Sequence, residues 1–351
     1  KSLRYKLIPQ MSVYDSIGWK FLPYLMFTQT PNFRSKVLNT DEMGFRYNSN
    51  FTKKNIFLEA KKNETILILG GSTAFGVGST KDENSISGYL EKEFDYNFIN
   101  LAGRGFTGFQ EIISLLANID DIKKLNIKKI FVMSGINDIY LNNFFDVKYP
   151  GIFYFNNLFL NKMNKNYSFK KKFYLKFLDL FLAPFDSDFD SYNFDNLKGN
   201  NFLKFLFSKK FRKAYKEIYD FKEMSLDDII KRNFSIYKSL EKIFSCEVVF
   251  FFQPVLNWSK KLNENEKALT DYSNLFFSRE NKYLNDFLSE KNKKFIDITK
   301  KISEMNKINF YDINEFFIKE NLNKEWLFVD SVHLNDDGYK LISKYLGNFL
   351  K

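Results

Sequence analysis

Thr65-Ile66-Leu67-Ile68-Leu69, followed by Gly70-Gly71-Ser72-Thr73, is the stretch of sequence that decides the fold. A continuous run of apolar and β-branched residues is typical of a strand that is buried on both faces, as in a parallel sheet. The two glycines permit a tight turn directly after this strand, which would present the Ser72 hydroxyl at the carboxyl edge of the sheet. Taken alone, Gly-Gly-Ser-Thr also fits an ordinary strand-to-helix turn.

Further short apolar segments alternate with helical patterns along the chain. This alternation predicts a three-layer α/β/α sandwich around a parallel sheet of about five strands. After residues 65–69, the expected strands are 98–101, 129–133, 247–252 and 294–298. A last helix should begin at Asn335-Asp336-Asp337, whose side chains can cap it, because the apolar residues from Leu341 to Phe349 recur at helical spacing.

The chain is expected to have three parts. Residues 1–60 are interrupted by prolines that break any long helix, so we predict an N-terminal arm packed on the core. Residues 61–140 and 225–351 would form the α/β domain, in which Ser225 caps the crossover helix. The intervening segment, 141–224, is far longer than a usual crossover, and its Lys/Phe spacing suits helices. We therefore predict a large insertion, helical in character, over or beside the active site.

Charge and cysteine content narrow the function classes. The formal net charge is +11, which attracts polyanions and so allows an anionic glycan or a membrane surface as a partner. The basic runs are broken by acidic stretches and come without a zinc-finger or RNA-recognition motif, so a specific nucleic-acid function is not expected. Cys246 is the only cysteine and precedes an apolar run, which predicts a buried thiol and leaves the compartment open. Nothing in the sequence indicates the oligomeric state.

Ser72 gains significance from His333, the only histidine of the chain. A serine hydroxyl needs a base with a pKa near neutrality to attack an ester, and imidazole is the usual base. Asp330 precedes His333 by three residues and in a turn could accept its Nδ1 hydrogen, which would fix the tautomer and stabilise the imidazolium. We therefore predict a catalytic triad of Ser72, His333 and Asp330. The alternatives are a histidine without a catalytic role and an aspartate that only caps a turn.

Acyl transfer also requires hydrogen-bond donors for the tetrahedral oxyanion. Asn137 lies in Gly135-Ile136-Asn137-Asp138, directly after the third expected strand, and could present its side-chain amide at the same sheet edge as Ser72. A backbone N–H from Gly103 or Gly105, after the second strand, and the N–H of Ser72 itself would complete an oxyanion hole. Each of these motifs is, by itself, also a common loop.

Taken together, these motifs resemble the four sequence blocks of the SGNH/GDSL hydrolase superfamily: Ser72 with its glycines, Gly105, Asn137, and the pair Asp330 and His333. The resemblance covers residues 65–140 and 247–350, with the blocks in the family's order. It implies a flavodoxin-like sheet and an oxyanion hole made by Ser72, Gly105 and Asn137. Gly105 is preferred to Gly103 because its distance along the chain from Asn100 is closer to the family pattern.

Three residues near these blocks need separate interpretation. Gly71 stands where the family's usual Gly-Asp-Ser has its aspartate, as in Gly-Gly-Ser-Thr variants. Asp138, beside Asn137, is expected to brace its loop by hydrogen bonds rather than to take part in catalysis. Arg104 could meet an anionic substrate group, although a solvated loop arginine is the simpler interpretation.

The resemblance implies a serine esterase that forms an acyl-Ser72 intermediate without a metal or a cofactor. Its expected substrate is an O-acetylated or otherwise acylated carbohydrate. Two alternatives stay open: an O-acyltransferase acting on a cell-surface polysaccharide, and a catalytically inactive carbohydrate-binding module. Residues 39–46 resemble an arm that precedes such domains in envelope-polysaccharide proteins, and the chain starts at Lys1. We therefore expect a cell-envelope or periplasmic location with an upstream signal or anchor, the cytoplasm being the alternative.

Overall fold

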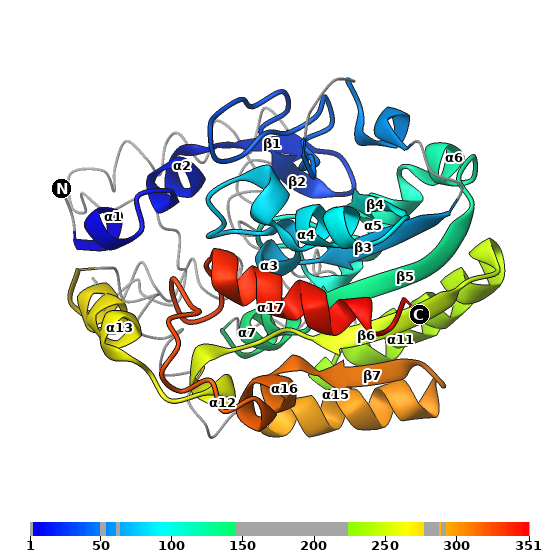
Figure 1. Cartoon of the computed structure of the whole chain (residues 1–351). Coiled ribbons are helices and arrows are strands. Elements are labelled where there is room, and N and C mark those ends of the chain that lie inside the picture. Colours follow the sequence, from blue (N-terminus) through cyan, green and yellow to red (C-terminus); the bar gives the residue numbers. More distant parts are fainter. Residues whose placement is uncertain are drawn as a thin grey trace, which may run out of the picture. The chain divides into compact units, whose positions relative to one another are not determined.

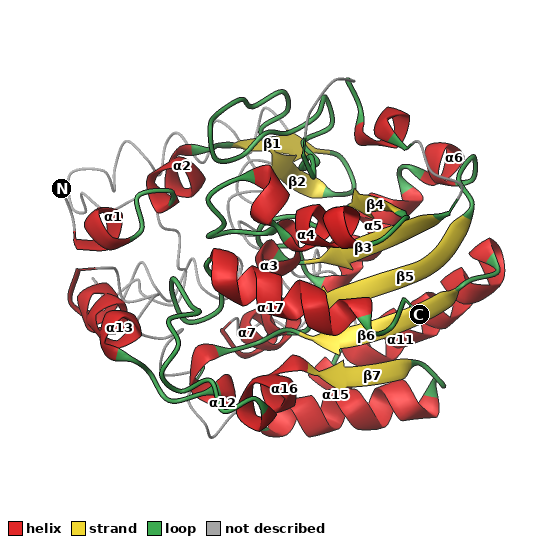
Figure 2. Ribbon diagram, in the orientation of Figure 1, coloured by secondary structure: helices red, strands yellow, loops and turns green. Residues whose placement is uncertain are grey.

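The computed structural model of the chain has a five-stranded parallel sheet at its centre (Figures 1 and 2). The strands are β3 (Thr65–Gly70), β4 (Asn97–Asn100), β5 (Ile127–Ser134), β6 (Glu247–Phe252) and β7 (Asn309–Asp312). Their spatial order is β4-β3-β5-β6-β7, the flavodoxin-like doubly wound order. The predicted fold class is therefore confirmed.

The residues that the structure describes are 3–49, 54–60, 64–144, 224–276, 288 and 293–350. All of them belong to one unit of the chain, Lys1–Phe153 together with Met224–Lys351. The predicted insertion, 141–224, lies outside the described residues from 145 to 223, so its helical character stays a prediction.

Two hydrophobic clusters, one on each face of the sheet, make the three layers. Alternate residues of β3 divide between them: Leu67 and Leu69 belong to one cluster, Ile66 and Ile68 to the other. The first cluster includes residues of α5 (Gly108–Leu116), α11 (Leu226–Phe244) and α15 (Lys294–Met305). The second includes residues of α4 (Ile86–Glu93), α16 (Ile313–Lys319) and α17 (Asp336–Gly347). In Figure 1, α4 and α17 lie in front of the sheet and α11 lies behind it.

The fifth predicted strand was wrong. Residues 294–298 begin helix α15, and the edge strand β7 follows it at Asn309–Asp312. The helix buries Ile296, Thr299 and Ile302, a spacing of three that a five-residue window does not reveal. The real strand escaped prediction because an edge strand needs fewer apolar residues, and the residues of β7 are exposed or only partly buried.

Two helices begin at the caps that the sequence indicates. The Ser225 side chain accepts a hydrogen bond from the Asp228 backbone N–H at the start of α11. The Asn335 side chain accepts one from the Gly338 N–H at the start of α17. Helix α17 buries Ile342 and Leu346, as its periodicity predicts.

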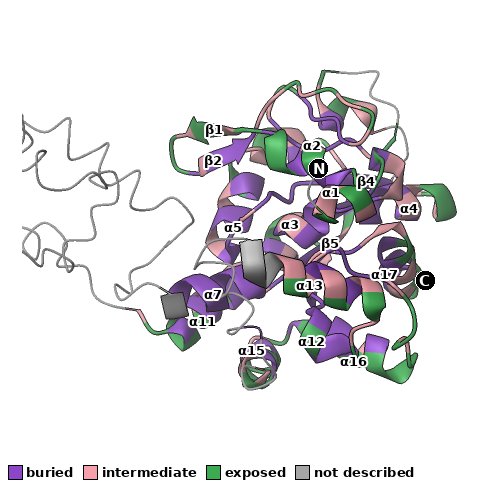
Figure 3. Ribbon diagram, turned by 90° about the vertical axis from the view of Figure 1, so that its left-hand side faces the viewer, coloured by how far each residue is buried: buried purple, intermediate pink, exposed green. Residues whose placement is uncertain are grey.

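The described residues among the first sixty have more regular structure than their prolines indicate. They contain two short helices and an antiparallel hairpin: α1 (Leu3–Leu7), α2 (Met11–Ser16), β1 (Trp19–Leu22) and β2 (Met26–Gln29), with a 3₁₀ turn, η1 (Ile56–Glu59), after them. Figure 3, in which buried residues are purple, shows that β2 is largely buried. Residues of this arm enter both hydrophobic clusters, Tyr14 on one face of the sheet and Phe45 on the other.

The remaining described elements are short connections and one longer helix: α3 (Ser72–Phe75), η2 (Asp82–Asn84), α6 (Ile119–Ile122), α7 (Ile136–Phe144), α12 (Leu256–Ser259) and α13 (Glu264–Phe276). None of the helices in the described ranges is both long and apolar enough to cross a bilayer. Cys246, expected to be buried, is only partly buried beside β6. Its burial still raises the pKa of the thiol to about 12.

Candidate active site

Ser72 lies where the sequence places it, at the carboxyl end of a central strand. It is the first residue of α3, and Gly71, the N-cap, joins this helix to β3. The segments that follow β4 and β5 lie beside it. Phe106, after β4, and Asn137, in the first turn of α7 after β5, both have atoms next to Gly71. A Cβ on Gly71 would lie 2.7 Å from Asn137 Nδ2. A side chain at position 71 would therefore collide with the Asn137 amide, which explains why glycine stands here at the position of the family's aspartate.

The structure brings Ser72, His333 and Asp330 into one hydrogen-bonded chain. The Ser72 Oγ lies 2.7 Å from His333 Nε2, although the two residues are 261 positions apart. On the other side of the ring, His333 Nδ1 lies 2.7 Å from Asp330 Oδ2. This arrangement lets the hydroxyl donate to Nε2 while the Nδ1 hydrogen is donated to the carboxylate.

The loop that carries His333 also shapes the environment of Asp330. Its second carboxylate oxygen, Oδ1, accepts the backbone N–H groups of Val332 at 3.0 Å and His333 at 2.9 Å. Burial opposes ionisation of Asp330, but the interactions with His333 and the Val332 amide outweigh it and lower the pKa of this carboxyl to about 2. Asp330 is therefore ionised throughout the neutral range and can stabilise an imidazolium at His333.

Side chains that the sequence analysis did not assign hold the His333 loop in place. Thr73, next to Ser72, donates from Oγ1 to the Val332 carbonyl at 3.0 Å, and Gln253 Nε2 donates to the same Oγ1 at 3.1 Å. Glu266 accepts the backbone N–H groups of Leu327 and Phe328 at 3.0 and 3.1 Å. The only signal for Gln253 was its position directly after β6, where a sheet-edge residue is expected.

Glu266 itself is held by a buried ion pair with Lys260. Both side chains are fully buried, and Lys260 Nζ also donates to the Glu325 carbonyl at 2.7 Å. A buried charge pair of this kind requires its remaining polar positions to be satisfied, and here the backbone of the loop before Asp330 satisfies them. Neither residue stands near the four blocks in sequence, so their spacing could not reveal this role.

Gly103 and Gly105 differ in whether their backbone N–H groups are free to bind an oxyanion. The Gly103 N–H donates to the Gly70 carbonyl at 3.1 Å and is therefore occupied. Within the described part of the chain, the N–H groups of Ser72 and Gly105 have no hydrogen-bond partner. The Asn137 Nδ2 donates to the Phe106 carbonyl at 2.7 Å, which places this amide beside the same loop. These positions agree with the choice of Gly105.

Asp138 braces the site as expected. Its Oδ2 accepts the Gly108 N–H at 2.7 Å, so the first turn of α7 is tied to the first turn of α5. Close by, the buried Glu111 accepts a hydrogen bond from Ser134 Oγ at 2.5 Å and another from the Tyr237 hydroxyl at 3.4 Å. Burial raises the pKa of both carboxyl groups, that of Glu111 well above its ordinary value.

Both interpretations offered for Arg104 were wrong, because the arm covers this residue. Its side chain donates to Gln29 Oε1 at 2.6 Å and to the carbonyls of Tyr14, Ile17 and Gly18 at 2.6, 2.9 and 3.1 Å. The guanidinium also lies 4.1 Å from the centre of the Trp19 ring, and burial lowers the pKa of Arg104 to about 10. Arg104 therefore joins the arm to the loop that contains Gly105.

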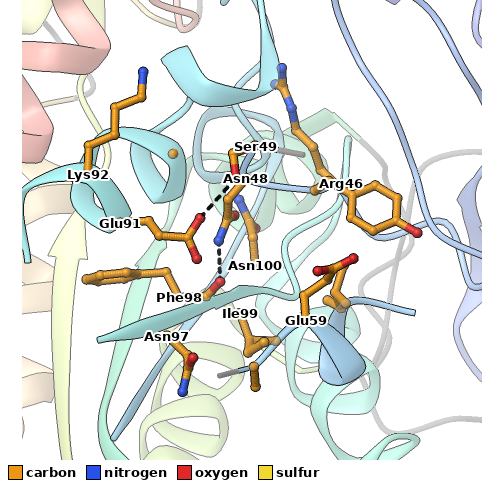
Figure 4. Close-up of a pocket in the computed structure, with 14 residues that line it drawn as sticks. Arg46, Asn48, Ser49, Glu59, Glu91, Lys92, Asn97, Phe98, Ile99 and Asn100 are labelled. Carbon is orange, nitrogen blue, oxygen red and sulfur yellow. Dashed lines mark hydrogen bonds between the residues drawn. The ribbon is translucent and has the colours of Figure 1, made fainter. Parts of the chain in front are cut away.

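A cavity of about 440 Å³ lies away from these residues, at the free edge of the sheet (Figure 4). It is lined by residues of the arm, α4 and β4, and none of Ser72, Asp330 or His333 contributes to it. Asn48 Nδ2 donates to the Phe98 carbonyl at 2.5 Å within it. In the parts of the chain that are described, no group of three His, Cys, Asp or Glu side chains could hold a metal ion.

The strand order and the four blocks at one sheet edge agree with the family resemblance. The fold is the flavodoxin-like α/β/α sandwich that this resemblance implies. No family model and no curated protein matches the chain.

Solved structures of an esterase, an acylhydrolase and a lipolytic G-D-S-L family protein are similar at low identity. The acetyl xylan esterase AlAXEase is 13% identical with a TM-score of 0.37, over 82% of this chain and 100% of that one. A lipase/acylhydrolase from Enterococcus faecalis is 9% identical with a TM-score of 0.37, over 81% and 93%. A member of the lipolytic G-D-S-L family from Veillonella parvula is 14% identical with a TM-score of 0.34, over 82% and 99%. Because these scores are low, the assignment of the fold rests on strand order and block positions.

Proposed function

We propose that the protein is a serine hydrolase that cleaves an ester through an acyl-Ser72 intermediate. The observation that carries this proposal is the chain of two 2.7 Å contacts from Ser72 to His333 and from His333 to Asp330. A hydroxyl, an imidazole and an ionised carboxylate in this order form the arrangement that activates a serine nucleophile. The His333 and Asp330 side chains are 17% and 31% exposed, so substrate and water can reach the site.

The reaction would proceed in two steps, acylation of Ser72 and deacylation by water. First, Ser72 Oγ attacks the ester carbonyl while His333 Nε2 takes the hydroxyl proton. The tetrahedral oxyanion accepts hydrogen bonds from the Ser72 and Gly105 N–H groups and the Asn137 amide. The intermediate then collapses: the C–O bond to the alcohol breaks, and His333 protonates the leaving oxygen. Second, water loses a proton to His333 and attacks the acyl carbon; the bond to Ser72 Oγ breaks, His333 returns the proton to Oγ, and the carboxylic acid leaves. None of these steps requires a metal or a cofactor.

The substrate that we propose is an O-acetylated or otherwise acylated carbohydrate. The family resemblance of the four blocks supports this class, and the diffuse positive charge of the chain suits an anionic glycan. Strong activity on long-chain lipid esters, with none on acetylated sugars, would overturn this part of the proposal.

Intact-mass analysis after incubation with p-nitrophenyl acetate tests the nucleophile. The wild type should gain one acetyl group, and Ser72→Ala should gain none, because the covalent bond forms at Ser72 Oγ. Ser235→Ala, which changes an exposed serine on α11, serves as the matched control and should acetylate like the wild type. Equal acetylation of wild type and Ser72→Ala would refute the mechanism.

The fate of the acetyl group separates hydrolase from transferase. Loss of the adduct to water alone identifies an esterase, whereas loss that requires an added glycan, with acetylated glycan as product, identifies an O-acyltransferase. Failure of a fluorophosphonate to label Ser72 would instead favour the inactive binding module.

A further inference from the structure

The nucleophile stands on a helix that cannot hold its own position. Helix α3 has four residues, Ser72–Phe75, and a helix of one turn is unstable by itself. The last carbonyl groups of a helix have no partners within it, so they need donors from elsewhere. The position of Ser72 Oγ relative to His333 therefore depends on the groups that bind this end of α3.

Side chains from three distant parts of the chain supply those donors. Asn100 Nδ2, at the end of β4, donates to the Ala74 carbonyl at 2.9 Å. Arg46 Nη1, from the N-terminal arm, donates to the carbonyls of Phe75 at 3.2 Å and Gly76 at 2.7 Å. In the turn that follows, the Tyr339 hydroxyl of α17 donates to the Val77 carbonyl at 2.6 Å.

Arg46 is the most firmly held of these donors. Its side chain has no solvent exposure, and Nε donates to Asp82 Oδ1 at 2.8 Å while Nη2 donates to the Val37 carbonyl at 3.1 Å. Asn39 of the arm also donates to Asp82, from its side-chain Nδ2 at 2.6 Å. Arg46 also lines the cavity at the sheet edge, and in Figure 4 its side chain runs away from the β4 residues on the other side of that cavity.

The backbone of α3 is shaped to receive the guanidinium. A Cβ on Gly76 would lie 2.7 Å from Arg46 Nη1, and Gly76 adopts a φ of 90°, which disfavours other residues. A positive charge at the carboxyl end of a helix is also favourable. Lysine could keep the charge but not the planar fork that reaches the two carbonyls, Asp82 and Val37 at once.

We propose that Arg46 is a positioning residue for Ser72. It fixes the end of α3 and thereby keeps the Ser72 hydroxyl within hydrogen-bond distance of His333. The inference rests on the proposed function, since positioning matters for catalysis only if Ser72 is the nucleophile. The alternative is that Arg46 merely anchors the arm and contributes to stability alone.

The single histidine offers a direct test that does not need an active enzyme. The ¹⁵N and Nδ1-proton resonances of His333 should report its bond to Ser72, and Ser72→Ala defines the signal when that bond is lost. In Arg46→Lys these resonances should shift toward the Ser72→Ala values. Phe45→Leu is the matched control, because Phe45 is the neighbouring buried arm residue and packs against Phe57 in the hydrophobic cluster on the opposite face of the sheet from Ala74 and Phe75 of α3. It should lower the melting temperature but keep the wild-type signal.

Kinetics supply the second readout, at a temperature where every variant is folded. Arg46→Lys should lower kcat and the rate of fluorophosphonate labelling about 10- to 100-fold, with little change in KM, because a displacement of about 1 Å has an effect of this size. Millimolar guanidinium should restore part of the rate in Arg46→Ala. Wild-type His333 resonances in folded Arg46→Lys would overturn the inference. An unlabelled, inactive wild type would overturn the proposed function, while the resonances would still decide the role of Arg46.

Discussion

Gly71 controls how closely two loops of the site approach each other. A side chain at this position would begin 2.7 Å from Asn137 Nδ2, and that amide already donates to the Phe106 carbonyl at 2.7 Å. Three loops, after β3, β4 and β5, therefore meet around one amide group. The space that the family's aspartate would need is filled here by Asn137.

Gly71→Ala should consequently displace the Asn137 amide. The backbone of Gly71, with a φ of −85°, is open to any residue, so the substitution acts through contact and not through strain. Losing one oxyanion donor costs about 10²- to 10³-fold in kcat. We expect a loss of that order in steady-state assays, with KM nearly unchanged. Gly18→Ala, whose Cβ would meet only Thr30 Oγ1 at 3.3 Å, is the control and should keep full activity.

At the scale of elements, buried acids tie helices α5 and α7 to their neighbours. Asp138 of α7 accepts the first N–H of α5, and Glu111 of α5 contacts Ser134 of β5 and Tyr237 of α11. These bonds hold the starts of two helices around the loop that presents Asn137. Because burial raises the pKa of Glu111, this carboxyl stays protonated at pH values where an exposed glutamate is ionised.

This raised pKa predicts how stability depends on pH. A carboxyl whose pKa is higher in the folded than in the unfolded state binds more protons when folded, so its stabilisation is complete below the unfolded pKa and is lost as pH rises through the folded pKa. The free energy of unfolding should therefore fall from pH 5 to pH 8, and Glu111→Gln should reduce that fall. Urea denaturation at the two pH values measures it, with Glu93→Gln on exposed α4 surface as control. An identical pH slope in wild type and Glu111→Gln would contradict the assignment.

The elements also show where sequence patterns succeed and fail. Helices α11 and α17 begin at Ser225 and Asn335, as predicted, because a cap is a local hydrogen bond between near neighbours. Residues 294–298 form a helix instead of a strand, because five residues are too few to separate the two periods, and the buried face of the longer segment decides. β7 has too few apolar residues to be recognised at all.

At the scale of the whole described unit, the N-terminal arm holds two loops of the candidate active site. Arg46 and Tyr14 bind the turn after Ser72 and α3, and Arg104, in the loop that contains Gly105, is bound by arm carbonyls from Tyr14 to Gly18. Tyr14 is 62 positions from Gly76, whose carbonyl its hydroxyl also contacts, and 90 positions from Arg104. The arm is therefore part of the support of the site.

Removing the Arg104 side chain should release the arm from the Gly105 loop. Arg104→Ala leaves buried carbonyl groups unpaired, and each unsatisfied buried group costs about 1–3 kcal/mol, so we expect a loss of about 3 kcal/mol or more in the free energy of unfolding. Denaturant unfolding measures this loss. Lys128→Ala breaks an exposed, solvent-screened ion pair with Glu64 and should change the free energy of unfolding far less. Equal losses in the two variants would show that the arm contacts contribute little.

The sequence by itself determined four of the five strands, the starts of helices α11 and α17 and the order of the candidate catalytic motifs. Strands buried on both faces and capped helices are local patterns, and a single histidine leaves one choice of base for Ser72. Only the tertiary structure decided which distant groups meet: Arg46 at the end of α3, Glu266 under the His333 loop, and Arg104 inside the arm. Such contacts arise when buried carbonyl and charged groups must find partners during packing, and the spacing of residues along the chain carries no record of those partners.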